Sequence, residues 1–586
     1  MSKPPVAAFQ DHLGDFTASP RLLLLAGMAA IAGLGGTVAA FVLLRLIALC
    51  TNLAYYQTVS TVMRDFPEHL PLWTIGIPVV GGLIIGLMAR YGSEKIRGHG
   101  IPEAIEAILI GQSKVAPKVA ILKPLSSAIS IGTGGPFGAE GPIIMTGGAL
   151  GSLFAQLFHL SSAERKTLLV AGAAAGMTAI FNTPIAAVLL AVELLLFEWK
   201  PRSFVPVVMA CVVAALFRPF LIGSGALFPY TGSPVFPWWG LGLCIAVGIV
   251  AGLQSAAMTL CLYAIEDFFH RLPIHWMWWP ALGGIAVGVG GYFDPAALGV
   301  GYDNIRALLA GGLDTHAAAL LLFLKMAIWL IALSSGTSGG VLAPLLIMGG
   351  ALGAVEGHFI PIADPGFWAL LGMSAILGGT MRAPLTATFF AVELTGNTHI
   401  LLPLMVATVA AFTVTVLLMK RSILTERIAR RGLHLTREYA VDPFLNSRVA
   451  EIMIHNVDCL PSTMKVGEAV RFYSGGNHRH KSYPVTDDKG RVLAMISRAS
   501  ALSWAGDPEV QNLTLAEALE GSSLLSGYDD ETVGALADRM IASDVGRVPI
   551  LSRATHKLVG LVSRRDLLKV RASQTHQETS RSQGFA

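Results

Sequence analysis

Long apolar stretches alternate with short breaks rich in glycine and proline along most of the chain. The segment 22–49 is long enough to span a bilayer and carries Arg45 as its only charge. Three other stretches, 101–110, 184–197 and 384–394, are shorter than the roughly 20 residues that a spanning helix needs. Each has a proline at or near its start, where proline favours a helix. Interrupted helices are tolerated at membrane depth only where they are buried in protein or line a polar cavity, so the pattern predicts a polytopic membrane domain built around a site.

Two halves of this apolar region repeat one another at a distance of about 200 residues. Three matching pairs of segments occur in the same order: 141–151 with 343–353, 176–180 with 372–376, and 181–194 with 381–394. A doubled chain of broken helices is typical of a channel or transporter whose site lies at the interface of the halves. We place the halves at about 21–220 and 236–432. The matches leave open whether the two halves are inverted.

Charge separates this apolar region from the rest of the chain. Of the 80 charged residues, 44 lie in 1–433 and 36 lie in the last 153 residues, although the whole chain is 53% apolar and 14% charged. The first part is therefore expected in lipid and the last part in water. Basic residues follow the last apolar segment directly at 420–421, which predicts a cytoplasmic tail. The net charge of +4 is too small to indicate a nucleic-acid partner.

The soluble part contains a second, smaller repeat. Segment 483–497 matches 548–563, and each copy has the pattern of a strand, a polar turn, a strand and a helix. The sequence thus predicts a pair of α/β domains. The predicted organisation is a cytoplasmic N-terminal segment 1–20, a membrane domain 21–432, α/β domains 447–506 and 510–573, and a disordered tail 574–586.

Three glycine- and proline-rich helix starts carry the candidate chemistry of the membrane domain: 98–103, 132–142 and 336–344. The free backbone N–H groups and the positive dipole end of a helix N-terminus bind anions without a charged side chain. Glu140 lies at the second start, and a carboxylate within the membrane is costly. Since a carboxylate mimics an anion, Glu140 is predicted to compete for the site. The alternative is a capping glutamate with no gating role.

These loops resemble the CLC family of chloride channels and chloride/proton antiporters over about residues 20–432. The segment Gly98-His-Gly-Ile-Pro102 is similar to the family's Gly-Ser-Gly-Ile-Pro loop. Gly138-Ala-Glu-Gly-Pro142 resembles its Gly-Lys/Arg-Glu-Gly-Pro loop, and Gly339-Gly-Val-Leu-Ala-Pro344 resembles Gly-x-Phe-x-Pro. The tail resembles a pair of CBS domains, which in that family sense adenine nucleotides.

The resemblance implies an all-α CLC-type fold of two inverted repeats with a cytoplasmic α/β CBS pair, assembled as a homodimer in lipid with one pore per subunit. Glu140 becomes the gate for chloride. The anion-binding positions implied are His99, Gly100, Ile101, Gly138, Val341, Leu342 and Leu424. In the tail, Ser563 and Asp566 match the CBS residues that hold the ribose of ATP, ADP or AMP, whereas the first copy has no acid there. The alternative is that the pair only dimerises.

Four positions depart from the family pattern. His99 replaces a serine, Leu342 a phenylalanine, and Leu424 the tyrosine that closes the inner mouth. For His99 two interpretations stand: its imidazole contacts the anion in a pH-sensitive way, or it turns away toward a carbonyl. Leu194 occupies the position of the glutamate that relays protons in the antiporters, with Glu193 before it. Since leucine carries no proton, this position favours a passive channel.

Several cations lie within apolar segments. Lys325 is central in its stretch, and Lys123 precedes Glu140 by 17 residues. Buried cations raise the potential for anions. The alternative for both lysines, and for Arg382, is pairing with carbonyl oxygens or with Glu193 and Glu393.

We therefore expect a voltage- or pH-gated chloride channel in the cell membrane, with both termini cytoplasmic. The first alternative is a chloride/proton antiporter of the same fold, and a remote one is a CBS-bearing cation transporter. No zinc-protease motif or catalytic serine–histidine pairing stands out, so no enzyme activity is expected. Neither a metal nor a resident cofactor is expected, apart from bound chloride and an adenine nucleotide.

Overall fold

The chain forms two compact units, which meet in sequence at residues 438 and 439. The computed structural model describes residues 20–109, 111–232, 238–360, 362–432, 444, 447–475 and 480–570. Of the predicted terminal segments, 574–586 and all of 1–20 except Pro20 lie outside the described residues.

The first unit is helical and apolar. Within the described ranges, six helices are long and apolar enough to cross a membrane: Arg21–Tyr56, Leu72–Tyr91, Pro201–Leu221, Gly240–Arg271, Thr315–Ser334 and Leu401–Arg430. Shorter apolar helices accompany them, among them Pro184–Leu196 and Leu342–His358. The predicted mixture of spanning and interrupted helices is confirmed.

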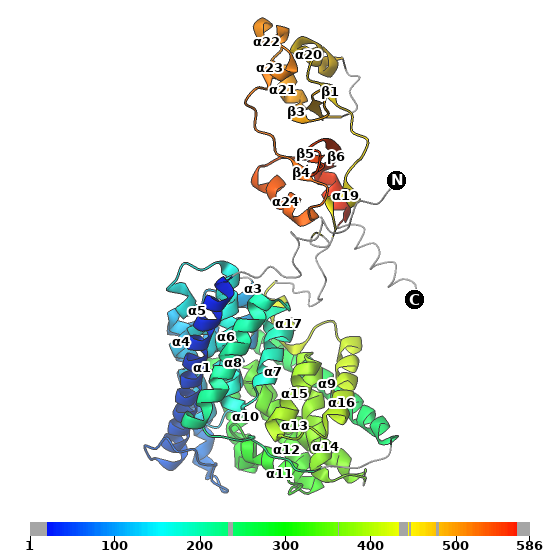
Figure 1. Ribbon diagram of the computed structural model, residues 1–586. Coiled ribbons are helices and arrows are strands. Elements are labelled where there is room, and N and C mark those ends of the chain that lie inside the picture. Colours follow the sequence, from blue (N-terminus) through cyan, green and yellow to red (C-terminus); the bar gives the residue numbers. More distant parts are fainter. Residues whose placement is uncertain are drawn as a thin grey trace. The chain divides into compact units, whose positions relative to one another are not determined.

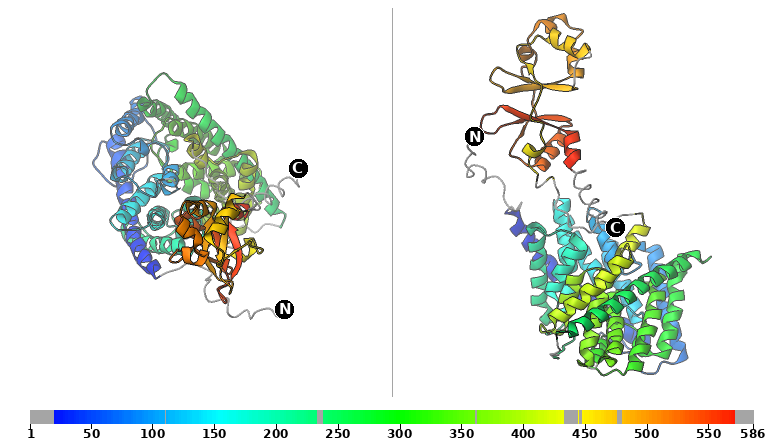
Figure 2. Two further views of the ribbon diagram at one scale, coloured as in Figure 1. Left: turned by 90° about the horizontal axis from the view of Figure 1, so that it is seen from above. Right: turned by 90° about the vertical axis from the view of Figure 1, so that its right-hand side faces the viewer.

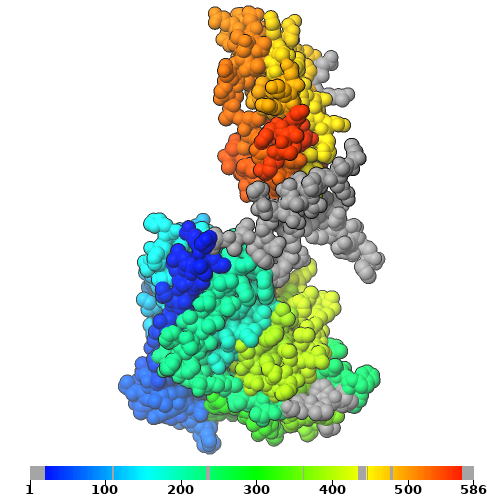
Figure 3. Space-filling model, viewed as in Figure 1, coloured from blue at the N-terminus to red at the C-terminus, as the bar shows by residue number. Residues whose placement is uncertain are grey.

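Helices of the first half recur in the second half in the same order, from α2 onward about 200 residues later. The first half contains α1 (Arg21–Thr51), α2 (Gly76–Tyr91), α3 (Ile101–Leu109), α4 (Pro117–Gly132), α5 (Glu140–Gln156), α6 (Ser162–Phe181), α7 (Pro184–Leu190) and α8 (Pro201–Leu221). The second contains α9 (Gly240–Arg271), α10 (Trp279–Phe293), α11 (Tyr302–Leu309), α12 (Thr315–Ser334), α13 (Leu342–His358), α14 (Pro365–Met381), α15 (Pro384–Thr395) and α16 (Leu401–Leu418), followed by α17 (Ile423–Arg430). In the space-filling view the first half, blue to cyan, and the last helices of the second half, yellow-green, occupy opposite sides (Figure 3).

Reciprocal contacts between α7 and α15 show how the halves are related. The carboxylate of Glu193, in the π-helical turn η5 (Ala191–Leu196) after α7, accepts a hydrogen bond from Thr386 N at 2.8 Å. Glu393, near the end of α15, accepts one from Ala186 N at 2.8 Å. Each carboxylate thus caps the start of the equivalent helix, which requires the two helices to be antiparallel. Such an exchange of identical contacts marks a two-fold relation.

Equivalent helices that run in opposite directions mean that the halves are inverted. Figure 1 agrees, because α3 and its counterpart α11 lie at opposite ends of the helical unit. The helices pack closely through glycines at matching places: a Cβ on Gly147 would collide with the carbonyl of Gly172, and one on Gly349 with that of Gly372. Small residues at helix contacts are what packing within lipid favours.

The second unit contains two similar three-stranded sheets, visible in Figure 2 (right). The strands are β1 (Leu460–Pro461), β2 (Ser482–Thr486) and β3 (Val492–Ser497), then β4 (Gly527–Tyr528), β5 (Arg547–Leu551) and β6 (Leu558–Ser563). The helices are α19 (Val449–Ile452), α20 (Val466–Ser474), α21 (Arg498–Ser503), α22 (Pro508–Asn512), α23 (Leu515–Ala518) and α24 (Val533–Ala542).

The two sheets share one topology, because in each the first strand is parallel and the third antiparallel to the central one. Pro484 and Pro549 occupy the same register in the central strands, opposite Met495 and Leu561. The predicted α/β repeat is confirmed.

Candidate anion site

Backbone hydrogen bonds join the three helix-start loops into one cluster. Gly98 N donates to Thr337 O at 3.1 Å. Gly138 and Gly340 exchange two hydrogen bonds, of 3.2 and 2.8 Å. The loops before α3, α5 and α13 therefore meet, and they come from both halves of the repeat, as the transporter architecture predicts.

Glu140 occupies the centre of this cluster. It is the first residue of α5, it is completely buried, and its Oε1 accepts hydrogen bonds from Leu342 N at 2.5 Å and Ala343 N at 3.1 Å. The carboxylate oxygen therefore stands where an anion would bind, at the free amides of the first turn of α13. Its Oε2 has no hydrogen-bond partner within the described part of the chain.

The amides that hold this carboxylate differ by one position from those expected. The sequence assigned Val341 and Leu342, whereas in the described structure Leu342 N and Ala343 N donate to the carboxylate and Val341 N does not. Val341 is the N-cap residue, so the amides of the first two helical residues are the ones directed at Glu140. Ala343 was missed because the position of the helix start was not resolved to one residue in the sequence.

Two glycines predicted to bind the anion have their amides engaged within the protein in this structure, and their anion contact stays a prediction. Gly100 N donates to Glu103 Oε2 at 3.1 Å, and Gly138 N donates to the carbonyl of Gly340. Both glycines also leave space. A Cβ on Gly138 would collide with the Glu140 carboxylate, and one on Gly100 would lie 2.6 Å from the carbonyl oxygen of Gly141.

His99 lies in the same cluster and is 1% exposed. Its carbonyl packs against Gly141, where a Cβ would collide with it. Its Nδ1 is a buried polar atom with no hydrogen-bond partner among the described residues, and both interpretations of the ring, anion contact or a bond to a carbonyl, stay predictions. Ile101 begins α3 directly after this loop and is fully buried.

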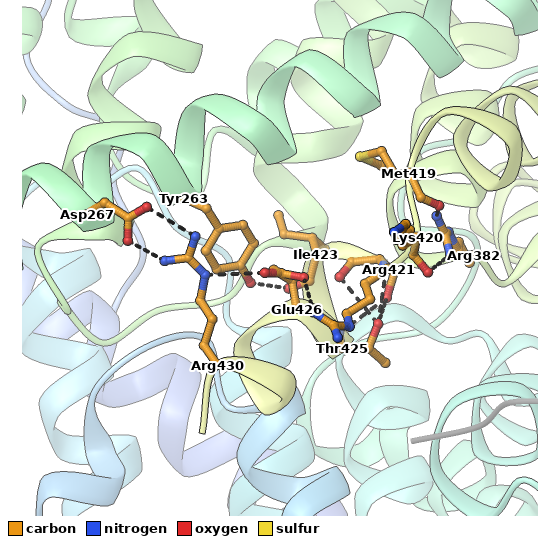
Figure 4. A network of polar contacts seen from close by, with 11 residues as sticks. Tyr263, Asp267, Arg382, Met419, Lys420, Arg421, Ile423, Thr425, Glu426 and Arg430 are labelled. Carbon is orange, nitrogen blue, oxygen red and sulfur yellow. Dashed lines mark hydrogen bonds and ion pairs between the residues drawn. The ribbon is translucent and has the colours of Figure 1, made fainter. Parts of the chain in front are cut away.

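The two buried lysines hold loops rather than carboxylates. Lys123 Nζ donates to Ile96 O at 2.8 Å and to Gly98 O at 2.7 Å. Lys325 Nζ donates to Gly299 O at 2.8 Å. Of the alternatives left open by the sequence, pairing with carbonyl oxygens is the one observed. Arg382 behaves in the same way, since it donates to carbonyls at the end of α16 (Figure 4).

The three leucines that replace family residues are all buried. Leu342 begins α13, Leu424 lies in α17, and Leu194 lies in η5 within the apolar core. A contact that the sequence did not indicate fixes α17, because Tyr263 on α9 donates its hydroxyl to Ile423 O at 2.5 Å (Figure 4). The start of α17 is therefore positioned by a tyrosine that bonds the backbone beside Leu424.

A serine cluster near the loops was also missed. Ser338 lies between the hydroxyls of Ser126 and Ser127 on α4, at 3.2 and 2.8 Å, and all three are buried. Two adjacent serines inside an apolar helix were the available signal.

In the tail, Ser563 and Asp566 contact each other. The carboxylate of Asp566 accepts hydrogen bonds from Ser563 N at 3.1 Å and from Ser563 Oγ at 2.5 Å, as a helix cap does. Burial opposes ionisation, but the hydrogen bonds from Ser563 and Lys569 hold the pKa of Asp566 below its ordinary value. In the first copy Ser497 caps the helix through Ser500 N. Nucleotide binding at Ser563 and Asp566 stays a prediction.

Comparison with known proteins places the chain in a family. The family described as "Voltage gated chloride channel" matches residues 81–416, and the CBS domain matches 449–507 and 525–573. The first match covers more than half of the chain, so the chain belongs to the CLC family and carries two CBS domains.

Relatives include both channels and exchangers by name. A protein provisionally named as a ClcB-like chloride channel from Ralstonia nicotianae is 28% identical over 402 residues, 67% of this chain and 92% of the relative. The "H(+)/Cl(-) exchange transporter ClcA" of Salmonella typhi is 30% identical over 403 residues, 61% of this chain and 81% of the relative.

Solved structures share the fold. A slow cyanobacterial Cl−/H+ antiporter superposes with a TM-score of 0.61 at 25% identity, covering 71% of this chain and 99% of that one. A eukaryotic CLC transporter has a TM-score of 0.58 at 18% identity and covers 93% of this chain and 98% of that one. The expectation of anion transport through a membrane is confirmed at the level of the family, and gating as a channel is not.

Proposed function

We propose that this protein exchanges chloride for protons across the membrane, with Glu140 as the group that carries the proton and competes with the anion. The observation that carries the proposal is the Glu140 carboxylate, fully buried on the amides of Leu342 and Ala343. The names of the ClcA relatives and of the cyanobacterial neighbour support exchange over passive conduction.

The mechanism follows from the competition for these amides. An ionised carboxylate makes charge-assisted hydrogen bonds, which are about twice as strong as neutral ones. Protonation removes that advantage, so a neutral Glu140 leaves the α13 amides and a chloride ion takes its place. Because His99, Glu140 and Leu342 are at most 1% exposed, the anion must shed its water, and the amides and the imidazole N–H replace it.

Passive conduction, the interpretation that the sequence favoured, remains the second candidate because of Leu194. This residue is buried and apolar at the position of the family's relay glutamate. Glu193 beside it caps α15. Under exchange, protons would reach Glu140 by another route from that side.

The remaining parts of the proposal depend on the family resemblance and on the charge pattern. They are a homodimer in the cell membrane, both chain ends in the cytoplasm, no enzyme activity, and an adenine nucleotide at the CBS pair. Chloride is the substrate, and no nucleic acid is involved.

Chloride efflux from liposomes, measured with and without a proton ionophore, separates the two candidates. With potassium and valinomycin present to balance charge, an inward proton gradient drives chloride uphill through an exchanger, and its efflux accelerates when the ionophore relieves the proton imbalance, whereas efflux through a channel does not change. Glu393→Gln provides a matched control, since it changes a carboxylate that caps a helix away from the cluster. Chloride that always follows its own Nernst potential would establish the passive channel instead.

A further inference from the structure

A cavity of about 660 Å³ opens at the α17 end of the membrane unit. It is here called the basic basin, and it is lined by Glu94, Lys95, Arg97, Glu266, His270, Arg427, Arg430 and Arg431. Five of these eight side chains are lysine or arginine and two are acidic. The lining therefore favours negatively charged ligands, since long cationic side chains converge on one space.

Two of the arginines form the fixed wall of the basic basin. Arg430 lies between Asp267 and Glu426 and over the ring of Tyr263, with its ζ carbon 4.6 Å from the ring centre (Figure 4). Arg431 is held by Glu103 at 3.1 Å and by Glu106. Because acidic partners balance their charges, these two guanidinium groups contribute N–H donors and a fixed surface to the cavity, but little net charge.

Three other cations are less committed. Arg97 pairs with Glu94 through Nη1 at 3.3 Å, but its buried Nε has no hydrogen-bond partner in the described ranges, and its guanidinium stacks over Trp276 at 4.5 Å. Arg427 has one ion pair there, with Glu103, at a long 3.5 Å. Lys95 has none in the part of the chain that the structure describes. An unsatisfied buried guanidinium nitrogen is costly unless a ligand completes it.

The basic basin lies directly against the loops of the anion site. The guanidinium of Arg427 packs on Gly98, where a Cβ would collide with it, and that of Arg97 packs on Gly336, with Nη2 2.7 Å from a Cβ placed there. These glycines begin two of the three loops that surround Glu140. A ligand in the basic basin therefore obstructs the approach to the site from this end.

We propose that the basic basin binds an anion bearing several phosphate groups, and that the bound polyanion blocks chloride transport from the α17 end. Planar guanidinium forks match phosphate oxygens in paired hydrogen bonds, and several phosphates are needed to reach three separated cations. The volume lies within the roughly 300–1,000 Å³ of ligand pockets, which is far more than one chloride fills. A polyphosphate is too large to enter the fully buried cluster beyond, so it acts as a plug.

The phosphates have two chemical sources, a soluble polyphosphate or the headgroup of an anionic lipid, and one experiment separates them. Full-chain protein is reconstituted in phosphatidylcholine liposomes, and chloride flux is measured with tripolyphosphate on both sides. A second set of liposomes contains a phosphoinositide and no soluble polyphosphate. Sodium sulfate at matched ionic strength controls for screening.

For a soluble ligand, tripolyphosphate inhibits flux while sulfate does not, and Arg97→Gln and Arg427→Gln each weaken inhibition about tenfold, the effect of one lost charge-assisted hydrogen bond. For a lipid, the phosphoinositide alone inhibits, and the same variants relieve it. Lys95→Gln, at an exposed position, shows a smaller relief even if the arginine variants misfold. Arg306→Gln, a cation on α11 at the opposite end, keeps the full inhibition.

Three results would overturn the proposal. One is flux insensitive to both tripolyphosphate and the phosphoinositide. Another is inhibition that persists unchanged in Lys95→Gln and in the arginine variants. The third is loss of inhibition in Asp566→Asn, in the tail, which would show that the polyanion acts through the CBS pair. The flux readout does not depend on proton coupling, so the outcome is independent of the proposed exchange.

Discussion

The loop Gly98-His-Gly100 and its repeat counterpart Gly299-Val-Gly301 are built alike and lie at opposite ends of the membrane unit. All four glycines have positive φ, between 55° and 87°, a region that favours glycine. Each loop precedes a short helix, and a buried lysine bonds the carbonyl of its first glycine. The scaffold of the site is therefore duplicated, although the site is not.

The chemistry around the two loops differs in sign. The first borders the basic basin. The second borders a cavity of about 370 Å³ whose lining includes Asp65, Glu68, Asp294, Asp303 and one cation, Arg64. Duplication thus supplied two equal frameworks, and substitutions at the mouths made one end basic and the other acidic. The two ends can therefore differ in how strongly they attract anions although their backbones are alike.

The largest effect is expected where the repeat is least symmetric. Glu140 and Leu342 are the first residues of the equivalent helices α5 and α13, so only one half contributes a carboxylate. Glu140→Gln should abolish proton flux while chloride still moves, because the glutamine amide cannot take up and release the proton that we assign to this carboxylate. Paired chloride and proton flux measurements test this. Proton flux equal to that of the wild type would refute the role of Glu140.

The next largest effect is expected on thermal stability, when either buried lysine is replaced. Lys123→Met removes two hydrogen bonds, which leaves Ile96 O unpaired and Gly98 O with only a long bond of 3.4 Å from Gly339 N, whereas Lys325→Met removes one, to Gly299 O. Each unsatisfied group costs about 1–3 kcal/mol, so both variants should unfold at lower temperature, Lys123→Met more than Lys325→Met. Thermal unfolding in detergent measures the order. An equal Tm for both would show that the second carbonyl bond contributes nothing.

Exchanging the central residues of the two loops, His99 and Val300, tests whether only the first loop contributes to anion binding. His99→Val copies Val300 and removes the ring N–H from the first loop. Chloride binding, measured by calorimetry, should weaken about fivefold, one neutral hydrogen bond, while weakly hydrated nitrate is affected less. Val300→His at the other end should leave both affinities unchanged. Nitrate and chloride weakened equally would indicate a packing defect instead.

The smallest effect is expected in the acidic mouth, outside the spanning helices. A hydrogen bond with Asp303, together with burial and the Asp303 charge, raises the pKa of Asp65 to about 6 against the opposing Arg306. A raised pKa means that the pair stabilises its loop below the ordinary aspartate pKa and that this is lost as pH rises through 6. Hydrogen-exchange protection in segment 57–71, corrected for the intrinsic rise of exchange rates with pH, should therefore fall between about pH 4 and about pH 6.

Asp65→Asn keeps a hydrogen-bond donor to Asp303 and should flatten that pH profile. Glu68→Gln, in the same cavity, serves as the control and should preserve it. A profile that is equally steep in Asp65→Asn would assign the titration to another group.

Much of the fold was accessible in the sequence because apolar stretches, prolines and repeats are local signals. The three loops and Glu140 followed from the same signals, since helix starts determine where free amides lie. The sequence could not show which backbone amides are free. Gly100 N and Gly138 N donate hydrogen bonds to partners that only the folded chain brings near. For the same reason Tyr263 and Ser338 were not identified: their partners lie far away in sequence.

The function was also only partly predictable from the sequence. Leu194 indicates one missing proton carrier, but the path of a proton depends on all neighbours, and the relatives favour exchange. Similarly, the sequence did not predict the partner of Glu193, because its contact with α15 depends on the inverted arrangement of the halves.

The mutual caps of Glu193 and Glu393 have a consequence for the origin of the molecule. An ancestor with a single half and one such glutamate could have inserted in both orientations and paired with an upside-down copy, each subunit holding the other's helix. Fusion of the two genes would then have preserved a contact between the halves that already existed. Afterwards each copy was free to diverge, as long as those two acids were retained.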